Sequence, residues 1–199
     1  MSFSNEIPRL RDLMSATGRM KVRIQTATDA AKVIQSPFPK PWKPENPVFI
    51  NFDLWHQLPQ PQRDLVFLRE VSWLTAVRIF KVDIYQGVAI AGLFGALFEL
   101  AQGDAIGLVT AGGLTAFAGA QVWRSSRGTQ AEITADESAL RVAQRRGYNL
   151  PESAQYLIEG TEGIAELERR PLTFIELLRC QSLRAVVRAT QVSDKLRTE

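Results

Sequence analysis

Apolar residues are concentrated over residues 84–123, where the only charged residues are Glu99 and Asp104. The uncharged runs on either side of this acidic pair predict two apolar helices joined by a short turn. A bilayer core of ~30 Å takes about 20 residues of helix. The second run, residues 105–123, reaches that length, and the first reaches it only if the preceding helix continues into it. We therefore expect a transmembrane helical hairpin over residues 84–123.

Small residues recur at four-residue spacing within this interval. In water such glycines weaken a helix by up to ~1 kcal/mol each relative to alanine, but in lipid they let two helices approach closely. The glycines expected to pack in this way are Gly87, Gly95, Gly107, Gly112 and Gly119. The alternative is a pair of helices fully buried in a soluble core.

Cations flank the interval at Arg78, Lys81, Arg124 and Arg127, whereas the acidic turn between the two runs has none. The cytoplasmic flanks of membrane helices are enriched in lysine and arginine. We therefore expect an integral membrane protein with both termini in the cytoplasm.

Hydrophobic periodicity predicts helices on both sides of the hairpin. We expect these helices over residues 6–17, 28–34, 62–79, 129–147, 149–158 and 171–191. The first is amphipathic and stops at Gly18, and it lies either on a membrane or on the rest of the domain. The last carries a predicted core stripe of Phe174, Leu177, Leu178, Leu183 and Val187.

Other patterns predict strands and a connector. Alternation predicts an edge strand over residues 20–25 and a second strand over residues 48–55. Four prolines between residues 37 and 44 exclude regular helix and central sheet. They indicate a stiff connector, with a ligand for a proline-recognising groove as the alternative.

The fold class expected from these elements is mainly α, with a membrane helical hairpin continuous with a cytoplasmic helical domain and a small β element near the N-terminus. The regions are a basic N-terminal arm with the amphipathic helix and Pro-rich connector (1–46), a strand and long helix (47–83), the hairpin (84–123) and a C-terminal helical region (124–199).

Charge and cysteine content refine this picture. The net charge is +3, and residues 1–46 carry eight Lys/Arg against four Asp/Glu. A basic arm suits an anionic membrane surface. Nucleic acid is a less favoured partner because no aromatic residues for base stacking are interleaved with the cations between Arg9 and Lys32. Cys180 is the only cysteine, so no internal disulfide forms, and its apolar surroundings predict a packed thiol.

Two short motifs flank the hairpin. Arg69-Glu70-Val71-Ser72-Trp73 precedes it, and Glu132-Ile133-Thr134-Ala135-Asp136 follows it. This order resembles HtpX-like zinc metallopeptidases of the gluzincin type, in which a His-Glu-x-x-His helix, an apolar helical pair and a Glu-x-x-Ala-Asp helix follow one another. The resemblance implies a general-base position at Glu70 and a zinc-ligand position at Glu132, with Asp136 completing the second motif.

The first motif departs from that family, because Arg69 and Trp73 stand where both histidine ligands belong. A guanidinium stays protonated and an indole offers no lone pair, so neither ligates zinc. We expect no cofactor and a vacated site in which Arg69 supplies positive charge to Glu132 or Asp136 while Trp73 fills the cavity. The alternatives are side chains that never meet, or an unorthodox zinc site that includes His56 and Glu132.

The chain also resembles uncharacterised cyanobacterial membrane proteins, through Phe67-Leu68-Arg69-Glu70-Val71 and the Gly-rich pair. That resemblance implies a plasma or thylakoid membrane. The leading hypothesis is a non-catalytic membrane-anchored scaffold or assembly protein on a degenerate metallopeptidase-like frame, with another membrane protein as its partner. The alternatives are an active membrane metallohydrolase with Glu70 as general base, and a peripheral module that binds lipid or nucleic acid through its basic arm.

Overall fold

The computed structural model describes residues 3–28, 30–39, 45–76 and 129–198. The chain divides into two compact units, of which the first comprises Met1–Ala76 with Glu132–Glu199 and the second Val77–Ala131. The first unit is mainly helical, with a small sheet near the N-terminus, as predicted. The hairpin over residues 84–123 and its packing glycines lie outside the described residues. Within the described ranges, no helix is both long and apolar enough to cross a membrane.

A three-stranded sheet has the order β1-β3-β2. Strand β1 (Val22–Thr26) pairs in parallel with β3 (Asn46–Ile50), and β2 (Ile34–Gln35) pairs antiparallel with the end of β3. Strand β1 is an edge strand, as its alternating sequence predicts. The central strand carries the sheet's core contacts, because Val48 and Ile50 are both fully buried.

The helix predicted over residues 28–34 is wrong, because long-range hydrogen bonds to Asn51 hold this segment as bends and strand β2. The Asn51 side chain donates to the Ala30 carbonyl at 2.8 Å, and the Asn51 backbone N–H donates to the Val33 carbonyl at 3.0 Å. Val33 is fully buried as a result. Helix periodicity in so short a segment is outweighed by these contacts.

The strand predicted over residues 48–55 is also shorter than expected, because Asn51 caps a helix at that point. Its side-chain oxygen accepts hydrogen bonds from the backbone of Asp53 and Leu54, which starts α3 (Phe52–Trp55). An asparagine at this position satisfies N–H groups that a helix start leaves unpaired. The turn places Trp55 in the core, where it is fully buried.

The N-terminal region forms two helices, α1 (Phe3–Leu13) and α2 (Ala16–Lys21), in place of the single helix predicted to stop at Gly18. The Ser15 side chain caps α2 by accepting from the backbone of Gly18. Gly18 therefore lies inside a helix. A Cβ there would stand 2.8 Å from Cγ1 of Val71, so the glycine permits a close approach to the long helix α4 (Gln60–Ala76).

A buried ion network holds α1 against the domain. Glu6 Oε1 accepts three hydrogen bonds, from Arg9 at 2.8 Å, from Arg63 at 2.9 Å and from the Trp55 indole at 3.2 Å. Arg9 and Tyr148 each donate to the Asp64 carboxylate, at 2.5 and 2.6 Å. The amphipathic helix α1 therefore packs on the domain, and its Arg9 side chain is bound to two carboxylates there.

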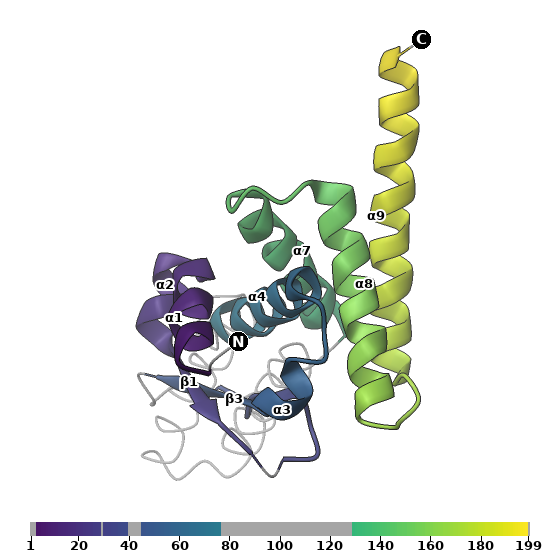
Figure 1. Ribbon diagram of the computed structural model, residues 1–199. Coiled ribbons are helices and arrows are strands. Elements are labelled where there is room, and N and C mark those ends of the chain that lie inside the picture. The colour runs from purple at the N-terminus through teal and green to yellow at the C-terminus, as the bar shows by residue number, and fades with distance from the viewer. Residues whose placement is uncertain (1–2, 29, 40–44, 77–128, 199) are drawn as a thin grey trace, which may run out of the picture. The chain divides into compact units, whose positions relative to one another are not determined.

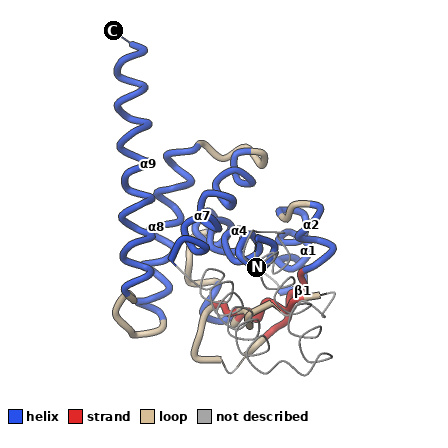
Figure 2. The backbone as a smooth tube through the Cα atoms, turned by 180° about the vertical axis from the view of Figure 1, so that it is seen from behind, coloured by secondary structure: helices blue, strands red, loops and turns tan. Residues whose placement is uncertain are grey.

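Helices α4, α7 (Thr129–Gln144), α8 (Leu150–Leu167) and α9 (Phe174–Thr198) form the rest of the unit. Figure 1 shows α8 and α9 side by side and antiparallel, with α9 extending beyond α8, and Figure 2 shows the same arrangement from behind. Helix α8 also packs on α4, where a Cβ at Gly160 would stand 2.7 Å from Cγ2 of Val66. As predicted, α7 is followed by Gly147 as a stop, with a positive φ of 92°.

The predicted core stripe of the last helix is partly wrong. Leu183 and Cys180 are buried, but Phe174 is 72% exposed and Leu177 is 49% exposed. The helix starts at Phe174 rather than residue 171. Its first turn therefore follows directly on the turn from α8 and does not reach the core.

The turn between α8 and α9 contains Arg169 in the left-handed region, with φ 51°. The Arg170 N–H donates to the Ala165 carbonyl and the Arg169 N–H to the Glu166 carbonyl, both at 3.0 Å. This is the Schellman pattern, in which glycine is the usual residue at the position of Arg169. A side chain in that conformation costs about 1–2 kcal/mol.

Candidate functional site

Three helices bring a set of charged side chains together in the first unit. Helix α4 presents Arg69 and Glu70, α7 presents Glu132 and Asp136, and α9 presents Arg179. Positions four apart share one helix face, which is why Glu132 and Asp136 both face α4. We call these five residues the ion cluster.

Arg69 is the centre of the ion cluster. Its Nη1 donates to Glu70 at 2.8 Å, its Nη2 forms an ion pair with Glu132, and its Nε lies 3.6 Å from Asp136 Oδ1. The side chain is only 13% exposed. The predicted approach of Arg69 to Glu132 and Asp136 is therefore found in the structure.

Arg179, on helix α9, is the fifth residue of the cluster. Its Nε and Nη2 donate to the two carboxylate oxygens of Asp136 at 2.8 and 2.7 Å. Burial opposes the charged form of this side chain, but the hydrogen bonds and charge of Asp136 leave the pKa of Arg179 raised. The sequence offered one weak signal for Arg179, an arginine within an otherwise apolar pattern, and we had not predicted it as a site residue.

The two arginines oppose each other electrostatically. Burial lowers the pKa of Arg69, and the nearby charge of Arg179 lowers it further, while Glu70 and Asp136 act in the other direction. A guanidinium nevertheless stays protonated in proteins. The cluster thus holds two permanent cations among three carboxylates, and each carboxylate has an arginine partner.

A short segment after β2 covers one side of the cluster. The Ser36 hydroxyl donates to the Glu70 carboxylate. The Phe38 ring stands edge-on to the Trp73 ring with centroids 6.0 Å apart, and Pro39 is buried. The start of the predicted connector is therefore docked on α4, while residues 40–44 lie outside the described part.

Trp73 occupies the position four residues after Arg69, on the same face of α4. Its indole N–H is buried and has no hydrogen-bond partner within the ranges that the structure describes. Its ring is used in packing, against Phe38 and the core. The expectation that Trp73 fills a vacated cavity stays a prediction, because the contacts of its ring are with Phe38 and the core.

A cavity of about 390 Å³ adjoins the cluster. Arg69, Glu70 and Arg179 line one side of it, and the α8–α9 turn lines the other. The charges on the turn side are also paired, because Arg170 donates to Glu168 at 2.7 Å and to Glu176 at 2.8 Å. Between them lies an apolar wall of Ile34, Val66, Leu157 and Ile164.

The residues of the cluster do not fit a zinc ion. Arg69 and Trp73 hold the positions of the two histidine ligands, and the Arg69 guanidinium already contacts the carboxylates that would approach the metal. Among the described residues, no three His, Cys, Asp or Glu side chains are arranged to hold a metal. His56 lies at the end of α3, where its Nδ1 is 2.7 Å from the Phe52 carbonyl oxygen.

Comparison with known proteins gives a family and one relative. A family model described as "Protein of unknown function (DUF3318)" matches residues 8–148. The chain is 28% identical over 157 residues to "Thylakoid membrane protein slr1949" of Synechocystis sp., an alignment that covers 77% of this chain and 73% of that protein. No solved structure matches. Neither match is described as a peptidase, so the resemblance to HtpX-like enzymes gains no support from them.

Proposed function

The chain belongs to the DUF3318 family, a family of unknown function, and we propose from its own geometry that it is a non-catalytic, membrane-associated assembly protein. The observation that carries this proposal is the position of Arg69. Its guanidinium binds Glu70 and Glu132 and lies beside Asp136. The carboxylates of the cluster therefore already take part in ion pairs that hold the helices together.

A general base needs an oxygen within hydrogen-bond reach of the proton that it abstracts. Glu70, the general-base position in the resemblance, lines the cavity, but its two oxygens already accept from Ser36 and Arg69. A metal at this place would meet the fixed positive charge of Arg69. We propose that the cluster is a structural lock on a metallopeptidase-like frame, with arginine in the role that a metal would otherwise fill.

The membrane part of the proposal has two supports. The relative from Synechocystis sp. is named a thylakoid membrane protein, and residues 84–123 have the composition of a helical hairpin. In sequence, α4 precedes that interval and α7 follows it. Ion pairs from Arg69 to Glu132 and Asp136 therefore tie the helix before the interval to the helix after it.

We propose a thylakoid or plasma membrane location with the termini in the cytoplasm. The partner we propose is another membrane protein, bound through the small-residue rows of the hairpin or through the cytoplasmic helices. Small residues favour close helix association in lipid. No cofactor is part of this proposal.

The test is to purify the full chain from membranes in detergent, measure its metal content, and identify what co-purifies with it. We expect no stoichiometric zinc and a defined membrane-protein partner. Stoichiometric zinc together with cleavage of a membrane substrate would overturn the proposal.

The control is Glu70→Gln. In an active hydrolase this change abolishes cleavage while the protein stays folded. In the assembly protein that we propose, Glu70→Gln leaves partner recovery intact and affects only stability, through the lost charge beside Arg69.

A further inference from the structure

The cavity of about 390 Å³ beside the ion cluster is lined by charged groups and by an apolar wall. Pockets that bind small molecules span about 300–1,000 Å³ and combine an apolar lining with a few polar groups. We propose that this cavity binds an uncharged, mainly apolar molecule that carries carbonyl oxygens at two ends, as a quinone ring does. The inference goes beyond the proposed assembly role and does not depend on the partner proposed there.

Arg179 supplies one hydrogen-bond donor to the cavity. The residue is 7% exposed and binds Asp136 through its Nε and Nη2 atoms. Its Nη1 atom makes no hydrogen bond with any residue in the described ranges, yet this nitrogen is not enclosed by protein. Because Arg179 lines the cavity, the N–H groups of Nη1 are available to a molecule that binds there.

Lys32 supplies a second donor from the other side of the cavity. The neighbouring Val33 N–H donates to Glu168 Oε1 at 2.8 Å, which holds this segment against the α8–α9 turn. The Lys32 side chain is exposed, lines the cavity, and has no ion pair or hydrogen bond with the part of the chain that the structure describes. Arg179 lies on the side of the ion cluster, so two free donors stand on opposite sides of the cavity.

The carboxylates that line the cavity are already used as acceptors. Both oxygens of Glu70, of Glu168 and of Glu176 accept a hydrogen bond from the protein. The groups left for a ligand are therefore N–H groups, which need an acceptor. A carbonyl oxygen is an acceptor that carries no charge.

The charge balance favours an uncharged ligand over an anion. Glu132 and Asp136 bind the lining residues Arg69 and Arg179, so both belong to the count. Four cations then stand against five carboxylates, a balance of −1 that a bound anion would make more negative. A cation would find every lining carboxylate bound to an arginine. The lining cations are Lys32, Arg69, Arg170 and Arg179, and the lining carboxylates are Glu70, Glu168 and Glu176.

The apolar wall between the two donors selects against water as the only occupant. It consists of Ile34, Val66, Leu157 and Ile164, of which the last three are buried. Water pairs with the N–H groups but gains nothing from these side chains, whereas an apolar ring removes their surface from water. The wall and the two donors together fit a molecule with an apolar body and an acceptor at each end.

The experiment uses the full chain in detergent and three small molecules. Duroquinone is a methylated quinone ring, durene has the same methyl groups on a benzene ring without carbonyl oxygens, and durene carboxylate is the anionic comparison. Protein-free micelles dialysed alongside give the free concentration of each molecule. We expect duroquinone, in about fivefold excess over its Kd, to raise the midpoint of thermal unfolding by about 2–4 °C. The other two should have little effect.

Variants test each donor and the cavity itself. Lys32→Met removes the donor of the turn side, and Asp136→Leu/Arg179→Met removes the other donor without leaving an unpaired charge of this pair buried. Each should raise the Kd of duroquinone about tenfold or more, as expected for a lost hydrogen bond to a charged donor. Ile34→Trp fills the cavity and should abolish binding, while its circular dichroism spectrum should match that of the wild-type protein.

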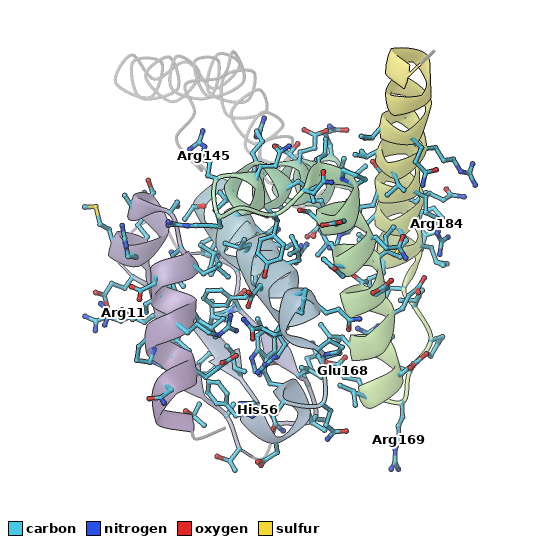
Figure 3. All side chains as sticks on the ribbon, turned by 45° about the horizontal axis from the view of Figure 1, so that its top comes forward. Arg11, His56, Arg145, Glu168, Arg169 and Arg184 are labelled. Atoms are coloured by element: carbon cyan, nitrogen blue, oxygen red, sulfur yellow. The ribbon has the colours of Figure 1, made fainter. Side chains whose placement is uncertain are left out.

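Arg169→Met is the matched control for Lys32→Met. Arg169 is an exposed cation of the same α8–α9 turn, and Figure 3 shows its side chain projecting away from the unit at the end of that turn. It does not line the cavity. The Kd of duroquinone should therefore be the same in Arg169→Met as in the wild-type protein.

Four results would overturn the proposal. Equal shifts with duroquinone and durene would show that the donors are not used, and a larger shift with durene carboxylate would make the cavity an anion site. A Kd that is unchanged in both Lys32→Met and the double variant would place the ligand elsewhere, and no shift with any of the three molecules would exclude the site. Zinc content and partner recovery, which test the proposed function, are measured without these ligands, so the two failures are distinguishable.

Discussion

Arg179 and Asp136 form a bidentate ion pair in which two guanidinium nitrogens bind the two carboxylate oxygens at 2.8 and 2.7 Å. The side chains are 8% and 3% exposed. The pair joins α9 to α7 across 43 positions of the chain. A planar guanidinium matches a carboxylate in this geometry, so the contact fixes orientation as well as distance.

Breaking this pair should destabilise the first unit strongly. We expect Asp136→Ala to lower the free energy of unfolding by about 3–5 kcal/mol, because Arg179 would remain buried without its main partner. The measurement is urea denaturation followed by circular dichroism in detergent.

The double variant Asp136→Leu/Arg179→Met should recover much of that loss, since no unpaired charge stays buried. Arg184→Met is the matched control, because it removes the exposed pair with Glu162 and should cost less than about 1 kcal/mol. If Asp136→Ala costs no more than this control, the cluster is not a structural lock.

The contact between α4 and α8 depends on Gly160. In Gly160→Ala the new Cβ would stand 2.7 Å from Cγ2 of Val66 and 3.2 Å from the Gln62 carbonyl oxygen. The Gln62 carbonyl cannot move away as the end of a side chain can. We therefore expect the free energy of unfolding to fall by about 1–3 kcal/mol, despite the better helix propensity of alanine. Thermal unfolding measures this loss.

Gly163→Ala on the same helix is the comparison. Its Cβ would meet Cδ2 of Leu58 at 2.8 Å, the end of a flexible side chain. This variant should be close to neutral. Comparable destabilisation in both variants would show that helix α8 tolerates no added side chain on this face and that backbone proximity at Gly160 is not the cause.

Acid should weaken the α8–α9 turn through Glu176. Burial acts to raise the pKa of Glu176, but hydrogen bonds from Arg170 and Thr173 outweigh it and lower the pKa from 4.5 to about 2. The native state therefore binds fewer protons than the unfolded chain between these values. Stability from this carboxylate is full above pH about 4.5 and is lost as the pH falls towards about 2.

Denaturant titrations above and within that window test this expectation. Glu176→Gln should lower stability above the window and flatten the pH dependence within it. Glu137→Gln, an exposed position on α7, is the control and should keep the wild-type profile. A wild-type profile in Glu176→Gln would assign the acid sensitivity to other carboxylates, such as Glu6.

Cys180 should resist thiol reagents in the folded protein. The residue is 1% exposed, and burial raises the pKa of its thiol, with Glu162 adding to the rise. Little reactive thiolate forms under these conditions. We expect disulfide-reagent labelling only on unfolding, whereas Met20→Cys, at a position that is 77% exposed, should gain one thiol that labels at once. Rapid labelling of the wild-type thiol would contradict this packing.

The long helices were predictable because each repeats its apolar pattern over several turns. Helices α4, α7 and α8 were all expected close to their observed starts, at Gln60, Thr129 and Leu150. The short elements were not. Asn51 ends a strand and starts a helix through its own side chain, and the segment around Val33 is shaped by bonds to a residue far along the chain.

The ion cluster shows the same division between local and distant information. The order of the two motifs along the chain led us to expect that Arg69 meets Glu132 or Asp136. The hydrogen bond from Ser36 to Glu70 and the pair of Arg179 with Asp136 join distant segments. Such pairs follow from tertiary packing, which spacing along one helix does not encode.

The attachment of α1 to residues far along the chain has a consequence for the order in which its contacts form. Arg146 donates to the Met14 carbonyl oxygen at 2.6 Å across 132 positions, and Tyr148 binds Asp64. At about 5–20 residues per second, a ribosome needs on the order of 10 s to add the intervening chain. Trp55, Arg63 and Asp64, which also hold α1, are made before residues 77–128. The first helix to emerge therefore gains its contacts in two stages, and it still lacks those from Arg146 and Tyr148 while residues 77–128 leave the ribosome.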